Sequence, residues 1–256
     1  MNGSPVFFAT ILFLASMTGY GIFMLTRKQA SRGVKVLLAF SAAYLLGITL
    51  LHLFPELYHS EVPHIGWYVV AGFLLQVVLD FFSHGVEHGH AHTHQHQGTR
   101  FLASVMISLW IHAFIEGMPF GGVVEMHAHD HAGHDHAHAG HDHRMSLLVG
   151  ISLHKVTEAL VFTALLFGMG MRTGKTLLWV VLFALMAPIG AFAHYFIGVS
   201  GVADLATFTP MVTGVLIGIL LHVSTVILFE SDESHSFNWI KFVAILIGLA
   251  MAGLVA

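Results

Sequence analysis

The chain has 256 residues, of which 56% are hydrophobic and only 9% are charged. Soluble domains carry about 25% charged residues, so this composition excludes an ordinary water-soluble fold and indicates an integral membrane protein. The formal net charge is −4 and no basic stripe is visible, which argues against a nucleic-acid partner. The chain has no cysteine, which excludes thiolate metal sites, but it has 22 histidines, and histidine is the commonest metal ligand.

Eight apolar stretches follow one another, each close to the roughly 20 residues that a bilayer-spanning helix needs. They cover residues 5–25, 36–58, 65–83, 102–124, 146–169, 176–198, 208–229 and 238–256. We therefore expect an all-α integral membrane protein, a single domain over residues 1–256 with eight transmembrane helices. Gly214 and Gly218 have the spacing of small residues at which transmembrane helices pack backbone against backbone.

The basic residues predict the orientation, because cytoplasmic loops are enriched in Lys and Arg. A basic cluster at 27–35 follows the first stretch, and alternation along the chain then places eight of the ten basic residues on the cytoplasmic side. Only Arg144 falls outside, and Lys155 falls within the membrane. We expect both termini outside, in a multi-pass protein of a cell membrane, and the compact chain suggests a bacterial one.

Two histidine-rich segments separate the apolar stretches. Residues 84–96 carry six histidines, within a loop at 84–101 that we expect in the cytoplasm. Residues 127–143 carry eight histidines and three aspartates, within an external loop at 125–145. Such segments bind divalent cations weakly and without fixed geometry. A solvated loop of biased composition is the alternative, but two segments flanking one helix favour metal handling.

Polar residues inside the membrane concentrate in two consecutive stretches, with His112 and Glu116 in the fourth and His154, Lys155 and Glu158 in the fifth. Each His–Glu pair is four residues apart and so shares one helix face. With a rise of about 1.5 Å per residue on antiparallel helices, His112 is expected level with Glu158, and Glu116 level with His154. Two imidazoles and two carboxylates suit Zn²⁺ or a similar divalent ion. The alternative is that these histidines only pack.

These residues resemble the motifs of the ZIP (Zrt/Irt-like) family of divalent-metal transporters. The family's fourth-span His-Asn-x-x-(Asp/Glu)-Gly is similar to HAFIEG at 112–117, and its fifth-span (His/Gln)-(Asp/Glu)-x-x-Glu is similar to HKVTE at 154–158. HLFPE at 52–56 resembles the second-span His-x-x-Pro-Glu, and PIG at 188–190 and His222 match positions in spans six and seven. Family members also have eight spans, both termini outside and a histidine-rich cytoplasmic loop after span three.

The resemblance implies a ZIP-like bundle that moves Zn²⁺ or a related divalent metal toward the cytoplasm, with the metal as cargo and without a cofactor. It implies a metal site formed by His112, Glu116, His154 and Glu158. It also implies helices that move against a more static scaffold, with Pro119 after the span-four motif and Pro188 interrupting span six. Further candidate pathway residues are His52, Glu56, Asp80, His194 and His222.

The chain departs from the family where many members bind a second metal. Ala113, Lys155 and Ala187 stand at positions that the resemblance assigns to an Asn, an acidic residue and a span-six Glu. We therefore expect a single metal, with the Lys155 ammonium in place of the second and paired with Glu116 or Glu158.

Two other functions stay open. One is a nontransporting metal sensor of the same fold. The other is a membrane-embedded zinc hydrolase, although a catalytic zinc usually has three protein ligands and an open position, and the HExxH signature is missing from the sequence. We expect that the protein is not an enzyme. The expected partners are divalent metal ions and the lipid bilayer. A homodimer is a further alternative.

Overall fold

The computed structural model describes residues 4–26, 30–83, 99–122, 143–229 and 238–255, and these parts of the chain contain helices and no strand. The expectation of an all-α protein is therefore confirmed. The histidine-rich segments lie outside the described residues, apart from His143, with which one helix begins. The helices are α1 (Pro5–Thr26), α2 (Ala30–Ile48), the π-helical turn η1 (Thr49–Leu53), α3 (Phe54–Tyr58), α4 (Gly66–Ser83), α5 (Thr99–Gly117), the 3-10 turn η3 (Met118–Phe120), α6 (His143–Gly168), α7 (Thr173–Val199), α8 (Leu205–Phe229) and α9 (Trp239–Leu254).

Seven helical stretches among the described residues are long and apolar enough to cross a membrane. They correspond to the first seven predicted stretches, the second being continuous from Gly33 to Tyr58 through η1 and α3. The eighth stretch forms α9, which is apolar but has only 16 residues. Its length of about 24 Å is below the 30 Å or so of a bilayer core. The protein is thus a multi-pass membrane protein, with seven candidate spans among the described residues.

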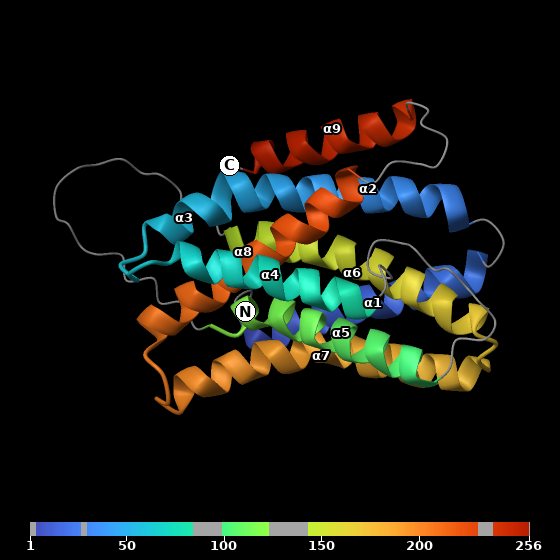
Figure 1. Ribbon diagram of the computed structural model, residues 1–256, viewed down its shortest axis with the longest axis horizontal. Coiled ribbons are helices and arrows are strands. Elements are labelled where there is room, and N and C mark those ends of the chain that lie inside the picture. The colour runs from blue at the N-terminus through green and yellow to red at the C-terminus, as the bar shows by residue number, and fades with distance from the viewer. Residues whose placement is uncertain (1–3, 27–29, 84–98, 123–142, 230–237, 256) are drawn as a thin grey trace.

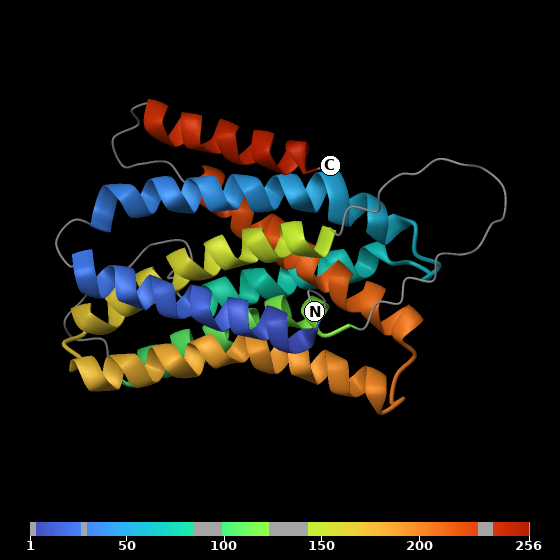
Figure 2. The ribbon, with the colours of Figure 1, turned by 180° about the vertical axis from the view of Figure 1, so that it is seen from behind.

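The helices run side by side along the long axis, with α9 at one edge of the bundle against α2 and α7 at the opposite edge (Figures 1 and 2). They form two groups. Helices α1, α5, α6 and α7 pack mainly on one another, and helices α2, α4, α8 and α9 do the same. The two groups meet chiefly where α2 contacts α6 and where α4 contacts α5. Helix α1 begins and α9 ends on the same side of the bundle (Figure 1).

Within each group the helices approach until their backbones touch. A Cβ atom added to Gly218 of α8 would overlap the carbonyl oxygen of Val69 on α4, and one added to Gly117 of α5 would overlap that of Ala187 on α7. The predicted role of Gly218 in close helix packing is therefore confirmed. Backbone contact of this kind is how helices associate where no water drives them together.

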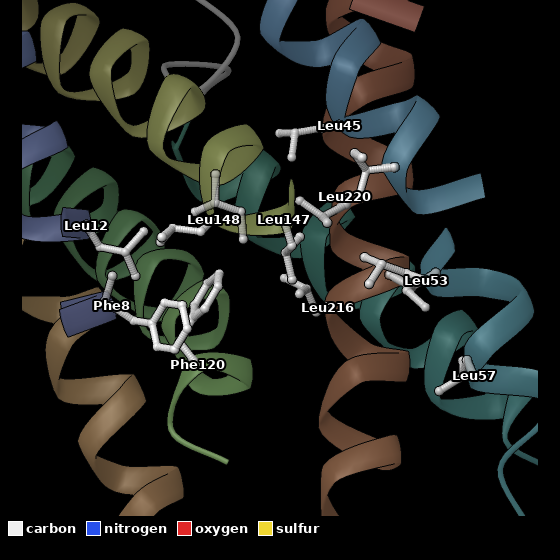
Figure 3. Packing of buried hydrophobic residues seen from close by; sticks show 14 of the residues in the cluster. Phe8, Leu12, Leu45, Leu53, Leu57, Phe120, Leu147, Leu148, Leu216 and Leu220 are labelled. Atoms are coloured by element: carbon white, nitrogen blue, oxygen red, sulfur yellow. The ribbon is translucent and has the colours of Figure 1, made fainter. Parts of the chain in front are cut away.

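Two apolar clusters lie on either side of a polar layer. Figure 3 shows the first cluster, in which Phe8 of α1 contacts Phe120 of η3 with ring centroids 5.2 Å apart. The second cluster is built around buried residues such as Phe162 of α6. Along α6 the first cluster includes Ile151 and the second begins at Ala159, so the polar residues between these two positions are enclosed on both sides.

The expectation that Pro188 interrupts its span is wrong. Helix α7 continues through Pro188, which is buried inside the helix. A proline removes one backbone N–H from the ladder, but this loss does not end a transmembrane helix that is held by its neighbours. Pro119, in contrast, lies in η3, where α5 ends.

Close packing at Gly218 predicts a stability difference between two glycine variants. Gly218→Ala should destabilise the protein by about 1–3 kcal/mol, because the added methyl forces α8 away from α4. Gly21→Ala on α1 is the matched control, since a Cβ there meets no atom within 4 Å and alanine favours helix by about 1 kcal/mol. Thermal unfolding in detergent measures both. Equal melting temperatures would contradict the packing described.

Candidate metal centre

The polar layer is formed by two helices, α5 with His112 and Glu116 and α6 with His154, Lys155 and Glu158. All five side chains are at most 1% exposed. Single atoms of His112, His154 and Glu158 that could ligate a metal all lie within 4.8 Å of one another. Glu116 joins them through its Oε1, 3.2 Å from His112 Nε2. The structure thus brings together all four residues that the sequence proposed as ligands.

Lys155 pairs with both carboxylates rather than with one. Its Nζ lies 2.5 Å from Glu116 Oε2 and donates a hydrogen bond of 2.6 Å to Glu158 Oε2. The ammonium also lies 5.0 Å from the centre of the Phe183 ring on α7, a cation–π contact. Lysine therefore takes one oxygen of each carboxylate and leaves the two Oε1 atoms for other partners.

Several atoms of the cluster have no hydrogen bond within the described residues. They include Glu158 Oε1 and both ring nitrogens of His154. Leaving a buried polar group without a hydrogen bond costs about 1–3 kcal/mol, and such groups are uncommon in native proteins. A cation between the histidines and the carboxylates would give a partner to Glu158 Oε1 and to one of the two His154 nitrogens. The cluster therefore has buried acceptor atoms that a cation could bind.

Gln76 contacts the cluster from a third helix and was not found by sequence reasoning. It is buried in α4, and its Oε1 lies 3.0 Å from His112 Nδ1. The signal in the sequence was a single amide in the otherwise apolar stretch 66–79. A polar side chain at this depth requires a partner, but the sequence does not reveal which one.

The positions assigned to a second metal hold no ligand. Ala113 is fully buried among apolar side chains of the second cluster. Ala187 lies where α7 and α5 touch, with its carbonyl oxygen against Gly117. The third position is Lys155, whose ammonium places a positive charge beside the two carboxylates.

Asp80 and His222, proposed separately as pathway residues, lie close together on α4 and α8. His222 Nε2 is 3.8 Å from Asp80 Oδ2, and its ring meets that of Phe73 edge-on at 5.2 Å. Asp80 is three residues from the end of α4, which leads into the predicted cytoplasmic loop. Asp80 lies four residues after Gln76 on α4.

The other proposed pathway residues do not join the cluster. His194 bonds through Nδ1 to the Met118 carbonyl at 2.7 Å and through Nε2 to Thr209 Oγ1 at 3.1 Å, so both of its nitrogens are occupied. His52 Nε2 lies 3.1 Å from the Ala252 carbonyl and ties η1 to the end of α9. Glu56 is exposed. His194 and His52 thus have structural contacts that explain them without a metal.

Arg144, the basic residue predicted on the outer side, holds the end of α5. It donates hydrogen bonds to the carbonyls of Pro119 at 3.1 Å and Gly122 at 2.6 Å, and it lies 5.3 Å from the Phe8 ring centre. Together with His194 it fixes the turn η3, directly beyond the span that carries Glu116.

No protein-family model matches the chain, and a comparison with curated proteins finds no match. The resemblance to the ZIP family thus depends on the motifs alone. The geometry of the buried cluster supports a metal centre independently of that resemblance.

A comparison of two buried histidines separates a ligand from a structural residue. His154→Leu should leave the metal-free protein as stable as the native one, or up to about 1–3 kcal/mol more stable, because its ring has no hydrogen bond to lose. It should also abolish the rise in melting temperature that zinc produces. Thermal unfolding with and without Zn²⁺ measures both effects, with the histidines of 84–96 and 127–142 replaced by serine throughout.

His194→Leu is the matched control, since it removes two hydrogen bonds and no proposed ligand. It should lower the melting temperature of the metal-free protein, with each lost bond contributing about 1 kcal/mol, and keep the zinc-induced rise. Retention of that rise in His154→Leu would contradict the assignment of His154.

Proposed function

We propose that the protein transports Zn²⁺ or a related divalent metal across a cell membrane toward the cytoplasm. The observation that carries the proposal is the buried cluster itself, in which His112, His154 and Glu158 present ligand atoms within 4.8 Å inside a bundle of apolar helices. Ionisable groups at this depth mark ion pathways, and imidazole with carboxylate suits zinc and its neighbours. Glu116 completes the set of four ligands.

The proposed topology has α9 as the eighth span and both termini outside, in a ZIP-like bundle of a bacterial cell membrane. A helix shorter than the bilayer core can span it when the bilayer thins locally or flanking residues reach the surface. Three features support this arrangement: the distribution of basic residues, the shared side on which α1 begins and α9 ends, and the bond from His52 to the last turn of α9.

Charge favours a single metal in the site. With neutral imidazoles, Glu116, Glu158 and Lys155 carry a net charge of −1, which one divalent ion converts to +1. A second divalent ion would leave +3 in a buried, low-dielectric layer, where like charges repel strongly. Because Lys155 holds only the Oε2 atoms, the metal can bind the Oε1 atoms while lysine stays in place.

Transport then requires helices to move, because apolar clusters close the layer on both sides. One group of helices (α1, α5, α6 and α7) would shift against the other (α2, α4, α8 and α9). The surfaces that slide would be those where α5 contacts α4 and where α6 contacts α2. The Asp80–His222 pair would receive the ion on its way to the cytoplasm. The external histidine-rich segment would raise the local ion concentration at the entrance.

Metal flux into proteoliposomes tests this function. The native protein should move zinc, and Glu158→Ala and His112→Ala should reduce flux to the level of empty liposomes, because each variant removes one of four ligands. Glu61→Ala is the control, since this exposed carboxylate lies outside the cluster. Binding without flux in the native protein would indicate the metal sensor instead, and hydrolysis of a lipid or peptide would indicate the hydrolase.

The stoichiometry of binding tests the role of Lys155. With the histidine-rich segments changed to serine, the native protein should bind one zinc per chain. Lys155→Asp removes the positive charge and adds a ligand, so a weaker second ion should enter. Lys155→Met removes the charge without adding a ligand and should still bind one. Elemental analysis and calorimetry measure the count, and two ions in the native cluster would contradict the assignment.

A further inference from the structure

We propose that Gln76 is a positioning residue of the metal site, which sets the tautomer and orientation of His112 so that its Nε2 can bind the ion. The proposal rests on the proposed function and adds a residue from a third helix to it. Gln76 does not touch the ion. It acts through the hydrogen bond between its Oε1 and His112 Nδ1, 3.0 Å apart and fully buried.

The hydrogen bond determines which imidazole nitrogen is available. A neutral imidazole carries one N–H and one lone pair. An amide oxygen at Nδ1 requires the hydrogen there, so the lone pair is on Nε2. Nε2 is the nitrogen that faces the cluster, 3.2 Å from Glu116 Oε1. The opposite tautomer would direct an N–H at the carboxylate and block both ligands.

His154 supplies the contrast within the same site. Neither of its ring nitrogens has a hydrogen bond in the described parts of the chain, so no such partner selects its tautomer. Within the described residues, His112 is held in a defined orientation by a side chain outside the proposed ligand set, and His154 is not. Loss of a partner of this kind typically weakens metal binding 10- to 100-fold.

The bond also crosses between the two groups of helices. Gln76 belongs to α4, which packs mainly on α8, whereas His112 belongs to α5, which packs mainly on α7. His112 is therefore held only while α4 and α5 keep this arrangement. A shift of α5 against α4 would release the imidazole and loosen the site, which couples metal affinity to helix position.

Three variants of the full-length protein test the proposal. Gln76→Met keeps the side-chain length but removes the acceptor. Gln76→Glu keeps an oxygen in the same place and offers no donor. Thr163→Val is the control, because it removes a fully buried side-chain hydrogen bond of 2.6 Å to Ala159 on α6 without touching the cluster. Zinc affinity is measured by competition with a chromophoric chelator, with the histidine-rich segments changed to serine.

We expect Gln76→Met to bind zinc 10- to 100-fold more weakly than the native protein, and Gln76→Glu to bind within about threefold of native or more tightly. Thr163→Val should bind as the native protein does. X-ray absorption at the zinc edge should count two imidazoles in the native protein and in Gln76→Glu, and fewer in Gln76→Met. If Gln76→Met does not fold, Gln76→Asn, one methylene shorter, should show the same loss.

Native affinity and two imidazoles in Gln76→Met would overturn the proposal while leaving the transport function intact. Equal weakening in Gln76→Met and Gln76→Glu at unchanged thermal stability would also overturn it, because the acceptor would then be irrelevant. Absence of zinc binding in the native protein would overturn this inference and the proposed function together.

Discussion

The ion pairs of Lys155 with Glu116 and Glu158 are the interaction on which the buried layer depends. Two carboxylates inside an apolar bundle repel one another. Removing charges from water also costs free energy, which is recovered only when the charges form ion pairs of good geometry. Contacts of 2.5 and 2.6 Å from one ammonium to both carboxylates provide that geometry and join α5 to α6. The Phe183 ring of α7 contacts the ammonium, so α7 also helps to hold the buried layer together. The ion pairs therefore stabilise the layer without a metal.

Two kinds of contact hold the bundle, and they differ in how easily they can be broken. Within each group, helices such as α4 and α8 touch through their backbones at glycine, a fit that permits little movement. Between the groups, α4 and α5 meet through fewer contacts, including the hydrogen bond from His112 to Gln76. A bundle built in this way should move by shifting the groups as units and should break the polar bond first.

The regular rise of a helix made much of the site predictable. The spacing of His112 to Glu116 and of His154 to Glu158 was enough to place the four side chains in one layer, because both segments lie within continuous α-helices. Gln76 could not be predicted, since the sequence does not say which helices are neighbours or how each is rotated. The two hydrogen-bond partners of His194, Met118 and Thr209, could not be predicted for the same reason, since they belong to other elements of the chain.

In the transport function that we propose, a lysine in place of a second metal changes what the site must do. Ions must bind well enough to enter and weakly enough to leave. The cluster has one net negative charge when empty and one net positive charge when loaded, so neither state carries a large excess in a low-dielectric layer. Without Lys155 the empty site would hold two unbalanced negative charges and grip a divalent ion more strongly. In the proposed transport cycle, the fixed ammonium would thus lower the net charge of the empty site. It would also weaken the binding of the ion that has to be released.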